Sequence, residues 1–156
     1  MICACSKKID EMIEPLRNLA GNIGAPLYDL AIRLYMADIF FRAGWLKFQN
    51  YLEDDWGSTI LPFEEIYPVP GLSPAIAALL TTGGEIILPV LLAFGLFGRF
   101  AAAGLLVITI VIEYLVPESY GLKNELHYFW MFLLLSTFLR GPGSLSLDAL
   151  LRRWSR

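Results

Sequence analysis

Two long apolar stretches limit what this chain can fold into. Residues 75–97 contain a single charged side chain, Glu85, and residues 100–116 contain a single one, Glu113. The hydrocarbon core of a bilayer is about 30 Å thick, and a helix needs roughly 20 mostly apolar residues to cross it. Only 17% of the 156 residues are charged, against about 25% in a soluble domain. The pattern predicts an integral membrane protein and excludes a disordered chain.

Two further segments are predicted to span the membrane. Residues 126–139 are apolar but cover only about 21 Å at 1.5 Å per residue, so this helix should begin earlier, near Leu122. Residues 27–48 are apolar between five charged side chains, Asp29, Arg33, Asp38, Arg42 and Lys47. We therefore expect an all-α integral membrane protein, with a bundle of four transmembrane helices within residues 27–139. The alternative is a soluble bundle with buried helices.

The distribution of lysine and arginine predicts the orientation of these helices. Eight basic residues lie before the first helix, between the second and third, and after the fourth: Lys7, Lys8, Arg17, Arg99, Arg140, Arg152, Arg153 and Arg156. The two other connections carry one, Lys123. Because basic residues accumulate on the cytoplasmic side, residues 1–26 and 140–156 are both expected in the cytoplasm. No signal peptide is expected, since the first 26 residues lack a sufficiently long apolar run.

The C-terminal tail has the pattern of an amphipathic helix on a membrane surface. Ser146 is a suitable N-cap for this helix. Its apolar residues share one face, opposite the arginines: Leu147, Leu150, Leu151 and Trp154. The net charge of −3 provides no basic surface for nucleic acid. The expected partners are therefore the lipid bilayer and a membrane or periplasmic protein.

Ionisable side chains inside the predicted spans are candidates for function, because they are costly in a bilayer. The six candidates are Asp38, Arg42, Lys47, Glu85, Glu113 and His127, and the predicted topology places five of the six at the midplane or in the outer half. Asp38 and Arg42 are four residues apart and can pair on one helix face. Two interpretations stay open. One is a polar pocket open to the outer side, and the other is a buried ion-pair network that fixes the order of the helices.

The residues around Glu85 favour a pocket at this point. Pro89 has no amide hydrogen for the carbonyl of Glu85, so a kink should open the backbone beside the carboxylate. Gly83 and Gly84 would allow a neighbouring helix to approach closely, or would allow this helix to bend further.

The first outer loop, residues 49–74, is apolar and rich in aromatic residues and proline. A solvated linker would be more polar, so this loop is expected to lie on the outer interface or to cap the bundle. Its candidate binding residues are Trp56, Glu65 and Tyr67.

Several common site chemistries are excluded or disfavoured. Cys3 and Cys5 are the only cysteines and lie on the predicted cytoplasmic side, so a membrane disulfide enzyme is disfavoured. This Cys-x-Cys pair is a weak candidate for a copper site. A single histidine, His127, excludes bis-histidine haem ligation and the usual zinc sites. His127 is expected to anchor the end of its span at the interface, with a proton-carrying role as the alternative.

Three motifs follow one another along the chain. They are Arg33, Phe40, Gly44 and Lys47 in the first predicted span, Glu85 with the turn Gly95-Leu96-Phe97-Gly98-Arg99, and Gly141-Pro142-Gly143 before Ser146-Leu147-Asp148. In order and spacing, residues 30–151 resemble the DoxX family of small bacterial membrane proteins with four spans. The sequence departs from the family pattern at Ala37, Asp38 and Ala43, where glycine, an aliphatic residue and histidine are common.

The resemblance implies a four-helix protein of the bacterial inner membrane. The DoxX family is named through a resemblance to membrane subunits of a thiosulfate:quinone oxidoreductase, so a redox role follows by analogy. This implies an accessory subunit of a membrane redox or metal-handling system, which binds a quinone or a partner protein. Any enzymatic activity would then belong to the complex. The alternatives are a small proton or solute carrier and a purely structural scaffold.

Overall fold

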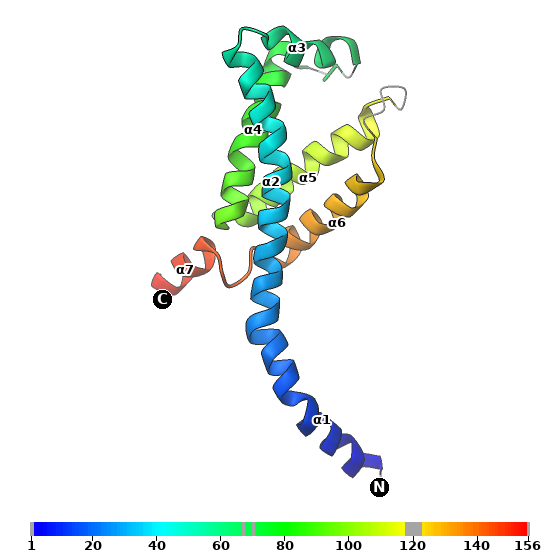
Figure 1. Ribbon diagram of the computed structural model, residues 1–156, viewed down its shortest axis with the longest axis vertical. Helices are drawn as coiled ribbons and strands as arrows, with labels where there is room; N and C mark the ends of the chain where they lie inside the picture. The colour runs from blue at the N-terminus through cyan, green and yellow to red at the C-terminus, as the bar shows by residue number, and fades with distance from the viewer. Residues whose placement is uncertain (1, 67, 70, 118–122, 156) are drawn as a thin grey trace.

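The computed structural model describes residues 2–66, 68–69, 71–117 and 123–155, with side chains described from residue 11 onward. These residues form helices and short connections, which confirms the expected all-α fold for them (Figure 1). The helices are α1 (Ile2–Leu19), α2 (Ala25–Leu52), α3 (Trp56–Leu61), α4 (Pro74–Phe94), α5 (Gly98–Leu115), α6 (Glu125–Arg140) and α7 (Leu147–Trp154). Two π-helical turns lie at Ala20–Gly24 and Pro62–Ile66.

Four helices form the body of the molecule. α2 packs on α4, α5 packs on α6, and a tight turn joins α4 to α5 (Figure 1). Their shared core contains Ile32, Met36, Phe40, Leu92, Ala101, Ala102, Leu105, Leu133 and Leu134. The small side chains of Ala101 and Ala102 are fully buried, which allows close packing of α5. α3 lies at one end of this bundle and α7 near the other, and we call these the α3 end and the α7 end.

Among the described helices, α4 and α5 are long and apolar enough to cross a membrane. The outer surface of the bundle is also apolar, and Leu79, Ile87, Val107 and Phe132 are each more than half exposed. Soluble monomers rarely expose large apolar patches, so this surface is suited to lipid. α2 carries five charged residues and α6 has only 16 residues, so their crossing of the membrane stays a prediction.

Helix α6 begins later in the sequence than we expected from the short apolar stretch at residues 126–139. The side chain of Asn124 accepts a hydrogen bond from the amide of Leu126 at 3.0 Å and acts as the N-cap. The helix therefore starts at Glu125, and the expected start near Leu122 is wrong, because residues 123 and 124 are not helical.

The chain is helical without interruption from Ile2 to Leu52, because the π-helical turn Ala20–Gly24 joins α1 to α2. Pro26 lies in the first turn of α2, where the missing amide hydrogen of proline is tolerated. α1 projects beyond the bundle (Figure 1). The predicted boundary between residues 26 and 27 therefore falls within a continuous helical segment.

The connection between α2 and α4 caps the α3 end of the bundle. Phe63 in the turn Pro62–Ile66 is 4% exposed and packs against Ala77 and Ala78 of α4. Trp56 and Val69 pack against the same cluster. The capping role expected for this apolar loop is confirmed by these contacts.

At the α7 end, the carboxylate of Asp148 binds the backbone at the start of α5. Both oxygens of Asp148 accept hydrogen bonds at 2.9 Å, one from the amide of Phe97 and the other from the amide of Gly98. These amides lie at the start of α5, where no helical carbonyl is available to them. The side chain of Ser146 accepts a hydrogen bond from the amide of Ala149 and caps α7, as expected from the sequence.

Arg33 of α2 ties the same end together and is 1% exposed. Its guanidinium donates to the carbonyl of Ala93 in the last turn of α4, at 2.9 Å, and to the carbonyl of Leu145. Gly95, with φ of 64°, lies directly against it, since a Cβ there would be 2.5 Å from Nη1 of Arg33. Residues from all three sequence motifs thus meet at the α7 end.

Candidate functional site

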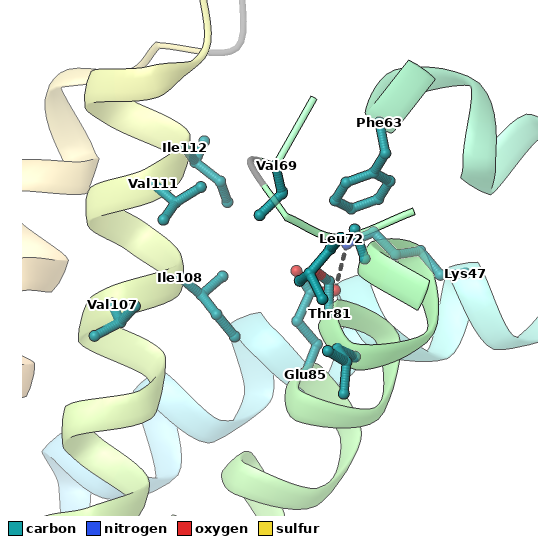
Figure 2. A pocket seen from close by; sticks show the side chains of 12 residues that line it. Lys47, Phe63, Val69, Leu72, Thr81, Glu85, Val107, Ile108, Val111 and Ile112 are labelled. Atoms are coloured by element: carbon teal, nitrogen blue, oxygen red, sulfur yellow. Dashed lines mark hydrogen bonds and ion pairs between the residues drawn. The ribbon is translucent and has the colours of Figure 1, made fainter. Parts of the chain in front are cut away.

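A cavity of about 270 Å³ lies between α4 and α5 near the α3 end (Figure 2). Four apolar side chains of α5 form one wall, namely Val107, Ile108, Val111 and Ile112. The remaining lining comes from α2, α4 and the capping connection: Lys47, Phe63, Val69, Leu72, Ala77, Leu80, Thr81 and Glu85. The cavity is therefore apolar apart from a lysine, a threonine and a glutamate.

Lys47 of α2 and Glu85 of α4 form an ion pair at this cavity (Figure 2). The ammonium of Lys47 donates a hydrogen bond to Oε2 of Glu85. The side chain of Glu85 is 2% exposed, whereas that of Lys47 is 28% exposed. A buried charge is strongly unfavourable unless it is paired, so the contact with Lys47 allows a charged carboxylate at this depth.

Gly44 brings α2 close enough to α4 for this pair to form. A Cβ at position 44 would lie 2.7 Å from the carbonyl carbon of Glu85 and 2.8 Å from its carbonyl oxygen. Backbone atoms cannot turn aside as a flexible side chain can, so glycine is required here. Pro89 donates no hydrogen bond to this carbonyl, yet α4 continues as a helix to Phe94.

The close helix approach expected near Glu85 occurs on the neighbouring helix instead. A Cβ at Gly83 would have no heavy atom within 4 Å, so of the two expected roles this residue does not fill that of a close-packing contact. At Gly84 the nearest atom would be a side-chain carbon of Ile108, at 3.4 Å. The tight contact is made by Gly44 of α2, one helical turn before Lys47.

The cavity opens to the side of the bundle. Leu80 of α4 and Val107 of α5 both line it, and each is 59% exposed. Phe63 covers the cavity from the capping connection and is itself buried. An apolar molecule could therefore enter from the surrounding lipid between α4 and α5.

A second buried pair joins α5 to α6. Nδ1 of His127 lies 2.8 Å from Oε2 of Glu113, and both side chains are less than 10% exposed. The ring of His127 also contacts the ring of Trp130, with centroids 5.0 Å apart. The expectation that His127 anchors at the interface is wrong, because the side chain is turned inward to this carboxylate.

The pair formed by Asp38 and Arg42 lies outside the bundle core. Nε of Arg42 lies 2.9 Å from Oδ1 of Asp38, as the spacing predicted, but these side chains are 79% and 57% exposed, respectively. Asp38 lines a separate apolar groove with residues of α2 and α4. The six predicted polar residues thus form three separate pairs, of which only the pair of Lys47 and Glu85 lines the cavity between α4 and α5.

The helical period of α2 distinguishes its inward-facing polar residues from its outward-facing ones. Arg33, Phe40, Gly44 and Lys47 recur at spacings that keep them on one side of a helix, and this side faces the bundle. Asp38 and Arg42 fall on the opposite side by the same period. Arg33 was absent from the predicted site, although the stripe identifies it as inward-facing.

The remaining candidates are less informative. Trp56 is half-buried in the capping connection, Glu65 is exposed, and Tyr67 lies outside the described residues. The side chains of Cys3 and Cys5 are also outside the described part. Among the side chains that the structure describes, no three His, Cys, Asp or Glu residues are grouped as a metal site requires.

Comparisons with known proteins identify the family. The family model described as DoxX matches residues 28–118, which include both members of the Lys47–Glu85 pair. A protein of Haemophilus influenzae, described as uncharacterized, is 30% identical over 139 residues, which cover 85% of this chain and 88% of the relative. No solved structure gives a significant match. Because the family match extends over more than half of the sequence, this membrane protein belongs to the DoxX family.

Proposed function

We propose that this protein is an accessory subunit of a membrane redox system and holds the head group of a quinone beside Lys47 and Glu85. One observation carries the proposal, namely that a single ion pair faces a cavity whose lining is otherwise apolar except for Thr81, within a membrane protein. Small-molecule sites are commonly apolar cavities with a few placed polar groups. A quinone has matching chemistry, because its ring is apolar on both faces and polar only at two oxygens.

The ion pair offers a hydrogen-bond donor for the oxidised quinone and a hydrogen-bond acceptor for the reduced quinol. The ammonium of Lys47 can donate a hydrogen bond to a carbonyl oxygen of the quinone. The carboxylate of Glu85 can accept one from a hydroxyl group of the reduced quinol. The faces of the ring would contact the apolar wall of α5 around Ile108. The apolar tail of the quinone would leave the cavity between Leu80 and Val107, whose exposed apolar side chains lie at the opening.

The core between the cavity and the α7 end favours binding over transport. Five large apolar side chains fill this region, and each is less than 5% exposed: Met36, Phe40, Leu92, Leu105 and Leu134. A proton or a polar solute would have to pass this cluster to cross the bundle, where a bare charge is strongly disfavoured. The observations therefore support a binding site more than a translocation path.

We expect Glu85→Gln to bind a short-tailed quinone in its reduced form, ubiquinol, about tenfold more weakly than the parent protein, because the carboxylate no longer accepts a hydrogen bond from its hydroxyl group and a hydrogen bond to a charged group contributes about 1.5–3 kcal/mol. Isothermal titration calorimetry of the purified protein in detergent measures the affinity. Asp38→Asn is the matched control, since it also removes a carboxylate from a helix but lies outside the cavity. This control variant should bind the quinol normally.

Two results would reject the quinone site. One is that the parent protein does not bind the quinol, and the other is that Glu85→Gln and the parent bind it equally. Either result would favour the purely structural scaffold, provided that both proteins elute as single species in size-exclusion chromatography.

We also propose that α2, α4, α5 and α6 all cross the bacterial inner membrane, with both termini in the cytoplasm. The four helices run between the same two ends of the bundle (Figure 1). The α7 end carries Arg99, Arg140, Arg152 and Arg153, whereas acidic residues dominate the capping connection at the α3 end. Basic residues accumulate on the cytoplasmic side, so the α7 end would be cytoplasmic and the α3 end periplasmic.

The topology predicts the behaviour of fused reporters. Alkaline phosphatase, which is active only after export, should be inactive when fused after Arg156 and active when fused after Asp54. A fluorescent protein at the same two positions serves as the inverse control. Phosphatase activity at the C-terminal position would contradict the four-span arrangement.

A further inference from the structure

Three arginines line a basin at the α7 end of the bundle. The basin measures about 390 Å³ and lies between the end of α6 and the start of α7. Its lining consists of Arg140, Gly143, Ser144, Ala149, Arg152 and Arg153. No carboxylate is part of this lining, which gives the basin a strong positive charge.

The nearby acidic groups are largely engaged elsewhere. The two carboxylate oxygens of Asp148 accept hydrogen bonds from the backbone at the start of α5, so they are turned away from the arginines. Asp29 approaches Arg140 at 3.6 Å, while the side chain of Arg140 remains 57% exposed. Within the described part of the chain, neither Arg152 nor Arg153 forms an ion pair with a carboxylate.

An apolar surface lies directly beside the basin. Helix α7 leads away from the bundle to one side (Figure 1). Its apolar side chains point to the outside, and Leu150, Leu151 and Trp154 are 43%, 52% and 80% exposed. A helix with arginines on one face and exposed apolar residues on the other is suited to the boundary between head groups and acyl chains.

We propose that this basin binds the phosphate of one anionic phospholipid, whose acyl chains cover the apolar face of α7. The planar guanidinium groups of arginine match the oxygens of a phosphate through paired hydrogen bonds. The hydroxyl group of Ser144, which is exposed at the rim, supplies a further donor. The site is independent of the proposed quinone cavity, which lies near the opposite end of the bundle.

Native mass spectrometry of detergent-solubilised protein tests this proposal. The parent protein is titrated with short-chain phosphatidylglycerol and, separately, with short-chain phosphatidylcholine. We expect phosphatidylglycerol to bind more tightly, and Arg153→Gln to weaken its binding about fivefold, in line with the contribution of a single basic residue at an anionic membrane surface. Arg152→Gln should have a similar effect.

The matched control is Arg17→Gln, which changes the net charge equally and lies in α1, away from the basin. It should leave the affinity for phosphatidylglycerol unchanged. Arg153→Lys keeps the charge but loses the paired hydrogen bonds of the guanidinium, so its affinity for phosphatidylglycerol should lie between those of the parent and Arg153→Gln.

Three outcomes would overturn the proposal. They are equal binding of the two lipids, an equal loss of affinity in Arg17→Gln and Arg153→Gln, and displacement of phosphatidylglycerol by inorganic phosphate at matched ionic strength. The last result would identify the basin as a site for free phosphate.

Discussion

Replacing Gly44 with alanine is expected to force α2 away from α4 and to lower the stability of the protein by about 1–3 kcal/mol, as overpacking of a core does. The added Cβ would lie 2.7 Å from the carbonyl carbon of Glu85, and neither helix can relieve that contact by rotating a side chain. The separation should also weaken the ion pair with Lys47, which lies one turn further along α2. Thermal unfolding in detergent measures the loss of stability, and quinone titration measures the effect on the cavity.

Gly83→Ala provides the control for this experiment. The same methyl group is added to α4, but nothing lies within 4 Å of its position. Alanine also has the higher helix propensity, so this variant should be as stable as the parent or slightly more so. Equal stability of Gly44→Ala and the parent would show that α2 and α4 do not pack as closely as described.

Arg33→Met is expected to lower the stability by about 3 kcal/mol, because two carbonyl groups at the α7 end each lose a charged hydrogen-bond donor. Methionine replaces the apolar part of the arginine side chain but offers nothing to the carbonyls of Ala93 and Leu145. The α7 end should loosen before the rest of the bundle. Hydrogen exchange read by mass spectrometry should therefore show faster exchange of amides near Gly98, and thermal unfolding should begin at a lower temperature.

Arg42→Met is the control for this substitution, since it removes an arginine from the exposed side of the same helix. Little change in stability is expected. Arg33→Lys should be intermediate, because a single ammonium cannot reach two separated carbonyls as a guanidinium does. If Arg33→Met unfolds at the temperature of the parent, the hydrogen bonds of Arg33 contribute no net stability.

The sequence indicated that Glu113 and His127 lie at the same end of the bundle, but it did not indicate the direction of their side chains. Glu113 and His127 were both placed near the outer ends of their spans, and the structure brings them together at the same end of the bundle. Their inward orientation depends on how α5 and α6 are rotated about their own axes. A helix that is hydrophobic on all sides gives no sequence pattern from which this rotation can be predicted.

The cavity beside Lys47 and Glu85 was the least predictable part of the molecule. Its position depends on Phe63, a residue in an irregular connection, and on the side of α5 that carries Ile108. Neither residue stands out from its many apolar neighbours in the sequence. Helix ends were easier to predict, since the N-cap role of Ser146 follows from local chemistry alone.

The hydrogen bonds of Asp148 also imply that the turn between α4 and α5 is completed only after α7 has been synthesised. A ribosome releases the chain from its amino end, so the amide of Gly98 emerges 50 residues before the carboxylate that binds it. α4 and α5 can enter the membrane as a hairpin during translation, but the turn between them lacks this partner until α7 has been made. Asp148, which is synthesised after α4 and α5, therefore holds the turn between these earlier helices in place.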